Sequence, residues 1–230
     1  MDEMNQHVEM KKAFITSIPV FAGYVVLGIG FGILLSNAGY GVVWAFAMSA
    51  FIYAGSMQYV GVSLLSSGAS LLSAALTTIM INARHLFYSI SMIKEYKDAG
   101  KYKPYLIFAL TDETYSLLAG SPVPEGCDPE KYRFFVSLFN QCYWVLGSVI
   151  GSVLGDILPF STKGIEFSMT ALFTAALAEQ WLSSKDHKPA LTGLLVTLIS
   201  LIIFGSENFL IPAMLGITFI LSLGYRKEKV

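Results

Sequence analysis

Long uncharged hydrophobic stretches dominate the chain. From Ala13 to Ile93 the only formally charged side chain is Arg84, and the stretches 134–162 and 189–225 carry one charge each. A helical membrane crossing needs about 20 apolar residues. The strands of an outer-membrane barrel would be about ten residues long and alternate in polarity, whereas these stretches are longer and uniformly apolar. The sequence therefore predicts an all-α, polytopic membrane protein.

Glycines, prolines and clusters of charge divide the hydrophobic stretches into separate helices. The predicted helices lie near residues 14–36, 42–65, 69–93, 104–119, 133–155, 166–183, 190–205 and 207–224. The first is long enough to cross a membrane and acidic residues precede its lysines, so we interpret it as a retained helix rather than a signal peptide. We expect one transmembrane domain over residues 1–230.

Basic residues form two clusters, one in the connector 94–103 and one in the tail after Tyr225. Both clusters favour the cytoplasmic side of the membrane. If every predicted helix crossed the bilayer, the two clusters would lie on opposite sides, because an odd number of helices separates them. We therefore expect one segment not to cross, with 104–119 and the two short segments after Glu166 as the weakest candidates. This leaves about seven spans, in a range of about six to eight.

An internal repeat appears at an offset of about 120 residues, and the alignment shifts by two residues between the two helices. Tyr24–Gly32 aligns with Tyr143–Gly151, and Met48–Gln58 aligns with Met169–Glu179. Composition bias alone can produce short matches between apolar helices, but two consecutive matches favour a duplication with halves at about 14–103 and 133–224. Such repeats are typical of secondary transporters, whose substrate site lies at the repeat interface. Whether the halves are parallel or inverted depends on the number of crossings.

Glycines recur four residues apart on two predicted helices. Gly28 and Gly32 lie on one, and Gly147, Gly151 and Gly155 lie on the other. The spacing places each set on one helix face and favours close packing between helices. The glycine run 28–32 is not a dinucleotide fingerprint, because no βαβ unit surrounds it. We expect no nucleotide cofactor.

Small and polar residues interrupt the second predicted helix at Gly55, Ser56 and Gln58. Such a segment can open a helix locally and leave backbone N–H groups free to meet a carboxylate. The alternative is a tightly packed patch in which Gln58 bonds to a neighbour. The repeat aligns Glu179 with Gln58, and an intramembrane carboxylate is costly unless it is paired, protonated or in contact with water. Glu179 is therefore a candidate for proton handling, or else an interfacial carboxylate.

The strongest local signal is the segment that contains Asn82, Arg84 and His85. A guanidinium in an uncharged helix must find an anion, backbone carbonyls or water; alternatively, Arg84 extends towards the basic connector. Asp112 and Glu113 follow on the next predicted helix and point about 100 degrees apart. We expect at most one of them to face Arg84, with the other facing water or a loop. The pair predicts an ion pair or proton relay, or else marks an interfacial helix end.

The composition mainly excludes other classes of protein and of site. Hydrophobic residues make up 54% of the chain and charged residues 13%, against about 25% charged in an average soluble domain. A net charge of -1 excludes nucleic-acid binding as a first interpretation. Neither the 2 cysteines nor the 3 histidines form a disulfide framework or a metal motif. We expect no metal and no other cofactor.

These motifs resemble those of the AzlC family. The segments Ala54–Gln58, Asn82–Ser89 and Leu110–Glu113 carry the resemblance, which runs from about Phe14 to past Pro212. It implies the large subunit of a branched-chain amino acid exporter in the bacterial inner membrane, working with a small membrane partner, AzlD. The implied substrates are valine, leucine, isoleucine and, in some cases, methionine. Met57 stands where we expect alanine in many members, which bears on the choice of substrate.

Two other function classes stay open beside transport. A channel or regulatory membrane subunit would show no saturable amino-acid exchange. An intramembrane protease would use Ser56 as nucleophile and His85 as base, but their order and spacing do not match the rhomboid pattern. We therefore expect a transporter in the lipid bilayer, not an enzyme, with Gly55, Ser56, Gln58, Asn82, Arg84 and His85 binding substrate. Asp112, Glu113 and Glu179 are the expected proton or ion-pair residues.

Overall fold

The structure, a computed structural model, describes residues 2–120, 122–157, 167, 174, 177–178, 181–182 and 186–228. Its elements are α1 (Asp2–Asn37), α2 (Val42–Ala47), the π-helix η1 (Met48–Ile52), α3 (Gly55–Ser66), α4 (Leu71–Asn82), α5 (Arg84–Met92), the 3-10 turn η2 (Gly100–Tyr102), α6 (Lys103–Phe108), α7 (Asp112–Gly120), α8 (Pro129–Ile157), α10 (Lys188–Asn208) and α11 (Leu210–Glu228). Within the described ranges every element is helical, and α1, α8 and α10 contain stretches long and apolar enough to cross a membrane. The predicted all-α membrane fold is confirmed.

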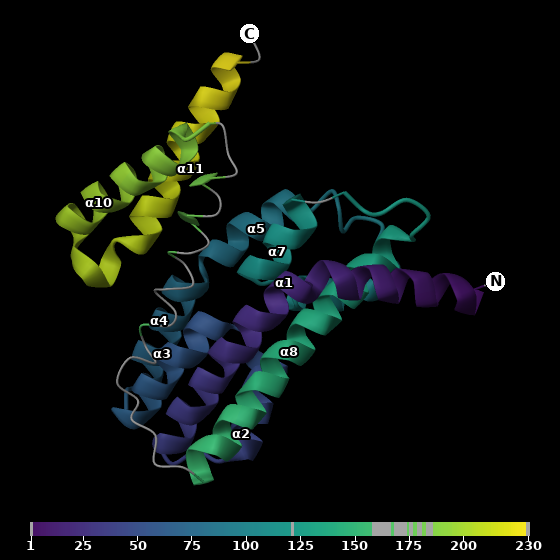
Figure 1. Cartoon of the computed structure of the whole chain (residues 1–230). Helices are drawn as coiled ribbons and strands as arrows, with labels where there is room; N and C mark the ends of the chain where they lie inside the picture. Colours follow the sequence, from purple (N-terminus) through teal and green to yellow (C-terminus); the bar gives the residue numbers. More distant parts are fainter. Residues whose placement is uncertain are drawn as a thin grey trace.

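Helices α1 and α8 pack side by side along most of their length (Figure 1). Gly28 lies against Ser148, Gly32 lies against Ser152, and the Ser36 hydroxyl donates a hydrogen bond to Asp156. The partners stay 120 residues apart in sequence along the interface, so the two helices run in the same direction. The two segments that align in the predicted repeat are therefore parallel neighbours. The other aligned segment, Met169–Glu179, lies almost wholly outside the described residues.

The predicted glycine faces form this interface, as expected. A Cβ atom on Gly28 would lie 2.9 Å from the Ser148 nitrogen, and one on Gly147 would lie 2.6 Å from the Val25 oxygen. Gly151 is in equally close contact with the backbone of Ile29. Backbone therefore meets backbone across the pair, an approach that only glycine permits in transmembrane helices.

The segment predicted as one helix over 42–65 instead folds back on itself. Gln58 donates a hydrogen bond to Ser49 Oγ at 3.2 Å, although residues nine positions apart in a straight helix are separated by about 13 Å. The chain reverses after η1, where Tyr53 adopts a left-handed conformation with φ of 45°. In Figure 1, α2 and α3 both lie beside the lower half of α1. The single-helix prediction was wrong here, because small residues at the break allow a re-entrant hairpin, which we name hairpin 1 (residues 42–66).

A second re-entrant hairpin approaches from the opposite end of the α1–α8 pair. Helix α6 leads inwards, and α7 leads back beside α5, where the rings of Tyr88 and Tyr115 stack at 4.9 Å. Tyr102, just before the hairpin, and Leu118, near its end, both pack against one apolar cluster that includes Leu106 and Leu110. The segment 104–119 was one of the two places where a missing crossing was expected, and it divides into α6 and α7, each too short to span a membrane. We name it hairpin 2 (residues 103–120).

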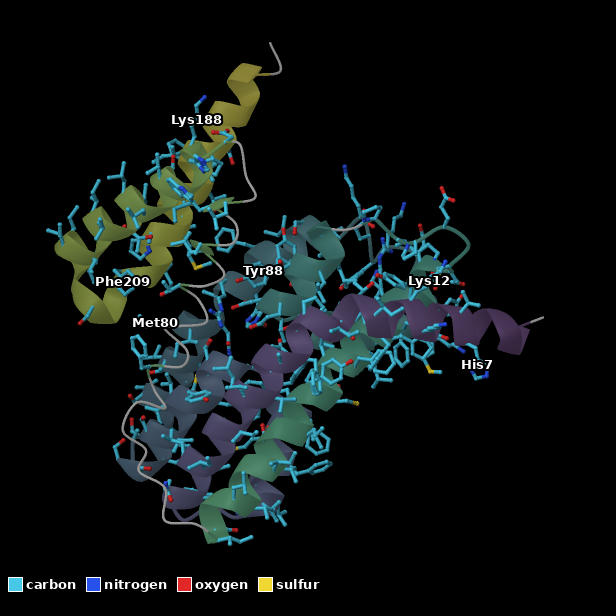
Figure 2. The ribbon with its side chains drawn as sticks, viewed as in Figure 1. His7, Lys12, Met80, Tyr88, Lys188 and Phe209 are labelled. Atoms are coloured by element: carbon cyan, nitrogen blue, oxygen red, sulfur yellow. The ribbon has the colours of Figure 1, made fainter. Side chains whose placement is uncertain are left out.

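The α4–α5 segment runs past both hairpins and is interrupted at Ala83. It ends at the connector 93–102, where Arg133 of α8 forms an ion pair with Glu95. Lys12 Nζ donates a hydrogen bond to the Glu125 carbonyl at 2.7 Å, so this connector, the loop 121–128 and the start of α1 lie at the same end. Lys12 is labelled there in Figure 2.

Helices α10 and α11 form an antiparallel pair (Figure 1). Lys188 and Phe209, labelled in Figure 2, mark the two ends of α10. The outer surface of the pair is apolar, with Ile202 83% and Phe219 66% exposed. A surface of this kind suits contact with lipid rather than water.

We predict that alanine at Gly151 destabilises the protein. The new Cβ would meet the Ile29 backbone, which cannot move aside without separating the two helices. Overpacking of this kind costs about 3 kcal/mol, which lowers the Tm by about 6–12 °C in a chain of this size. The Tm of purified protein in detergent measures the effect.

Gly193→Ala on α10 is the matched control for this substitution. Its Cβ would meet nothing within 4 Å, and alanine favours a helix over glycine by about 1 kcal/mol. Its Tm should stay the same or rise slightly. Equal Tm values for the two variants would contradict the proposed role of the α1–α8 contact.

Candidate functional site

A cavity lies where the tips of the two hairpins meet the break in α4–α5. It has an empty volume of about 440 Å³, part of which is open to solvent. Its lining combines apolar and polar groups. The residues are Tyr24, Leu27, Tyr53, Ala54, Gly55, Ser56, Arg84, His85, Thr111, Asp112, Glu113 and Trp144.

Hairpin 1 directs the beginning of α3 towards this cavity. Ala54 precedes the helix with no side-chain cap, and the first N–H groups of a helix have no intrahelical acceptor. Gly55 lies against the Trp144 ring, where an added Cβ would be 3.1 Å from Cη2. The absence of a side chain at Gly55 thus lets the ring of α8 approach the helix start. The helix is thus interrupted beside Gly55 and Ser56, which was one of the two alternatives for this segment.

Arg84 connects the two hairpins. Its Nη1 lies 3.1 Å from Asp112 Oδ2 on hairpin 2, and its Nη2 donates a hydrogen bond of 2.7 Å to Ser56 Oγ on hairpin 1. The guanidinium therefore faces the cavity instead of extending towards the basic connector. These partners include the anion and the polar group that a half-buried arginine requires.

Glu113 does not face water or a loop, as one member of the carboxylate pair was expected to do. Its carboxylate accepts a hydrogen bond of 2.6 Å from the Tyr24 hydroxyl. That hydroxyl also lies 2.6 Å from Thr111 Oγ1, which bonds to Thr114, and Asn140 of α8 donates to Thr114 at 3.0 Å. Glu113 thus belongs to a polar network that joins hairpin 2 to α1 and α8.

Gln58 and Asn82, two other predicted site residues, do not line the cavity. Gln58 is buried, donating to Ser49 and accepting from Trp144 Nε1 at 2.9 Å. Asn82 precedes the break, with its carbonyl oxygen 3.2 Å from Nδ1 of His85, a lining residue. Glu179 lies outside the described residues.

Sequence reasoning did not identify Tyr24, Tyr53, Thr111 and Trp144 as lining residues. Trp144 carried a usable signal, because tryptophan in membrane proteins concentrates at the interfaces, whereas this one lies in the middle of a long apolar helix. Thr111 and Tyr53 lie within two positions of candidate residues in the sequence but carry no charge. Within the described ranges, no group of three or more histidine, cysteine, aspartate or glutamate side chains is arranged to hold a metal ion.

Comparison with known proteins places these features in a family. Residues 19–158 match the AzlC protein family. The Bacillus subtilis branched-chain amino acid transport protein AzlC is 44% identical over 93% of this chain and 84% of its own length. The Escherichia coli inner membrane protein YgaZ is 29% identical over 76% of this chain and 73% of its own.

A Haemophilus influenzae membrane protein of uncharacterized function is 43% identical over 99% of this chain and 96% of its own. No solved structure matches the chain. The family match spans every residue that lines the cavity, from Tyr24 to Trp144. With the helical membrane fold, these similarities show that the chain belongs to the AzlC family of membrane transport proteins.

Proposed function

We propose that this protein exports valine, leucine, isoleucine and methionine across the bacterial inner membrane, together with a small AzlD-like membrane subunit. The observation that carries the proposal is the cavity itself, in which an uncapped helix start, a paired arginine and apolar rings meet between two re-entrant hairpins. The similarity to a branched-chain amino acid transport protein supports the substrate class.

The polar side of the cavity suits the carboxylate that all amino acids share. The N–H groups at the start of α3 and the helix dipole favour an anion. Ser56 and Arg84 lie beside this helix start and add a hydroxyl and a positive charge. A substrate carboxylate that binds there competes with Asp112 for the guanidinium, which gives binding a direct effect on the contact between the hairpins.

The apolar side of the cavity suits a branched side chain. Leu27, Ala54 and the rings of Tyr53 and Trp144 contribute to this wall. An apolar pocket separates side chains that differ by one methylene by only about 1–3 kcal/mol. We therefore expect related aliphatic amino acids to share the site, with no strong discrimination among them.

The distribution of charge supports one orientation in the membrane. The end that carries Lys12, the connector 93–102 and Arg133 is rich in basic residues, whereas the turns 38–41 and 67–70 at the other end carry no charge. The positive-inside rule places the basic end in the cytoplasm. Hairpin 2 then enters from the cytoplasm and hairpin 1 from the outside.

The contacts in the cavity favour transport over proteolysis. A serine protease needs a base that accepts the serine proton, whereas Ser56 Oγ accepts a hydrogen bond from Arg84. The nearby His85 has its Nδ1 close to the Asn82 carbonyl instead. A channel or regulatory subunit would share the fold, and saturable exchange separates it from a transporter.

We predict that proteoliposomes containing the chain and its small partner exchange internal valine for labelled external valine. The exchange should saturate, and leucine, isoleucine and methionine should compete with the label, because they present the same carboxylate and a similar apolar side chain. Lysine and glutamate should not compete. Purified pairs that assemble but show no exchange with any of the four substrates would refute the proposed function.

We also predict that Arg84→Lys and Arg84→Ala lower the exchange rate by more than about 100-fold, which corresponds to about 2.7 kcal/mol. Lysine cannot donate from two nitrogens in the fixed geometry that reaches Asp112 and Ser56 together. Arg133→Lys, at the surface pair with Glu95, is the matched control and should leave exchange unchanged. Near-normal exchange by Arg84→Lys would show that a simple positive charge is enough.

A further inference from the structure

We propose that Glu113 is a shared site for a proton and for the ammonium group of the substrate, each of which excludes the other. This inference rests on the proposed function and adds the coupling ion to it. The exporter then exchanges one amino acid moving outwards for one proton moving inwards.

The surroundings of Glu113 point to this role. The residue lines the cavity at the first turn of α7, and its partner is the neutral hydroxyl of Tyr24. The ion pairs of the described residues do not involve its carboxylate, and the nearby Arg84 pairs with Asp112 instead. A carboxylate within a membrane domain is costly unless a positive charge or a proton neutralises it. Glu113 therefore needs an exchangeable partner, which the cavity can admit.

Asp112, the adjacent carboxylate, differs in this respect. It already pairs with Arg84 at 3.1 Å, so its charge is compensated without a ligand. The two residues point in different directions from the same helical turn. This division assigns Asp112 to the contact between the hairpins and leaves Glu113 available to a ligand.

The position of Glu113 also suits a zwitterion. A substrate whose carboxylate lies at Ser56 and the start of α3 has its ammonium one carbon away, inside the same cavity that Glu113 lines. When the ammonium binds, the Glu113 carboxyl group releases its proton to water and the resulting carboxylate pairs with the ammonium. When the substrate leaves, a proton from water binds again. The substrate-loaded site carries one more negative charge than the proton-loaded site, so the exchange moves one positive charge inwards.

Several other titratable groups face Glu113 from the elements packed around it. They are Tyr24 on α1, Tyr53 at the tip of hairpin 1, Arg84, His85 and Tyr88 on α5, and Asp112 on α7. From α8, the neighbouring Asn140 and Trp144 side chains do not titrate. His85 is the rival to Glu113, because histidine changes its charge near neutral pH.

The direct test measures protons released when valine binds to the purified complex in weakly buffered detergent solution. The wild type should release about one proton per valine at the pH of maximal release, because one carboxyl group exchanges its proton for one ammonium. Glu113→Gln should release none. Glu125→Gln, in the exposed loop 121–128, is the matched control and should release as much as the wild type.

A second measurement separates a shared site from a merely structural role. In the wild type the Kd for valine should rise about tenfold for each pH unit on the acidic side, because protons and ammonium compete. In Glu113→Gln, binding should be weaker but independent of pH. Binding of 3-methylbutanoate, which has the carboxylate and the branched chain but no ammonium, should release no proton from the wild type.

Specific results would contradict the proposed role of Glu113. Undiminished proton release by Glu113→Gln overturns the inference, as does loss of release in His85→Gln or Glu179→Gln while Glu113→Gln retains it. In each of these cases valine exchange by the wild type would leave the proposed function intact. A wild-type complex that neither binds nor exchanges any of the four amino acids would refute the proposed function, and this inference with it.

Discussion

Backbone contact between α1 and α8 places the groups on which the cavity depends. Glycines on each helix lie against the backbone of the other, and the same two helices carry Tyr24 and Trp144, whose rings meet edge to face at 5.5 Å. Tyr24 holds Glu113, and Trp144 lies against Gly55. A wider separation of the two helices would move both walls of the cavity. Close packing along the helix pair thus sets the geometry of the cavity.

Interrupted helices in a membrane need partners for their free backbone groups, because lipid supplies none. Here the interruptions at Tyr53–Ala54, Ala83 and Ala109–Thr111 converge on one cavity. At α7 the Thr111 side chain accepts from the Thr114 N–H, so this helix start is capped by the protein. The start of α3 has no such cap. The two helix starts that meet the cavity thus differ in whether the protein caps them.

Sequence reasoning predicted the helical membrane fold, the glycine interface and most of the polar cavity residues, because charge and small-residue spacing are local signals. It did not predict the reversal at Tyr53, since an uncharged apolar segment such as 42–65 has the same composition whether it crosses or turns back. The sequence also did not identify Tyr24 as a site residue, for a related reason. Its partner Glu113 is 89 positions away, and a lone tyrosine in an apolar helix indicates nothing about what it meets.

The lengths of the connectors give the two hairpins different mechanical freedom. Turns of four residues, 38–41 and 67–70, connect hairpin 1 to α1 and α4. Each turn can span about 14 Å at most when fully extended. Hairpin 2 is joined through the longer connectors 93–102 and 121–128. Polar contacts such as Lys12 with Glu125 hold these connectors in place, and exposed contacts of this kind contribute about 1 kcal/mol or less. Hairpin 2, which carries the two carboxylates, therefore has the greater freedom to move. Weak surface contacts are what restrain it.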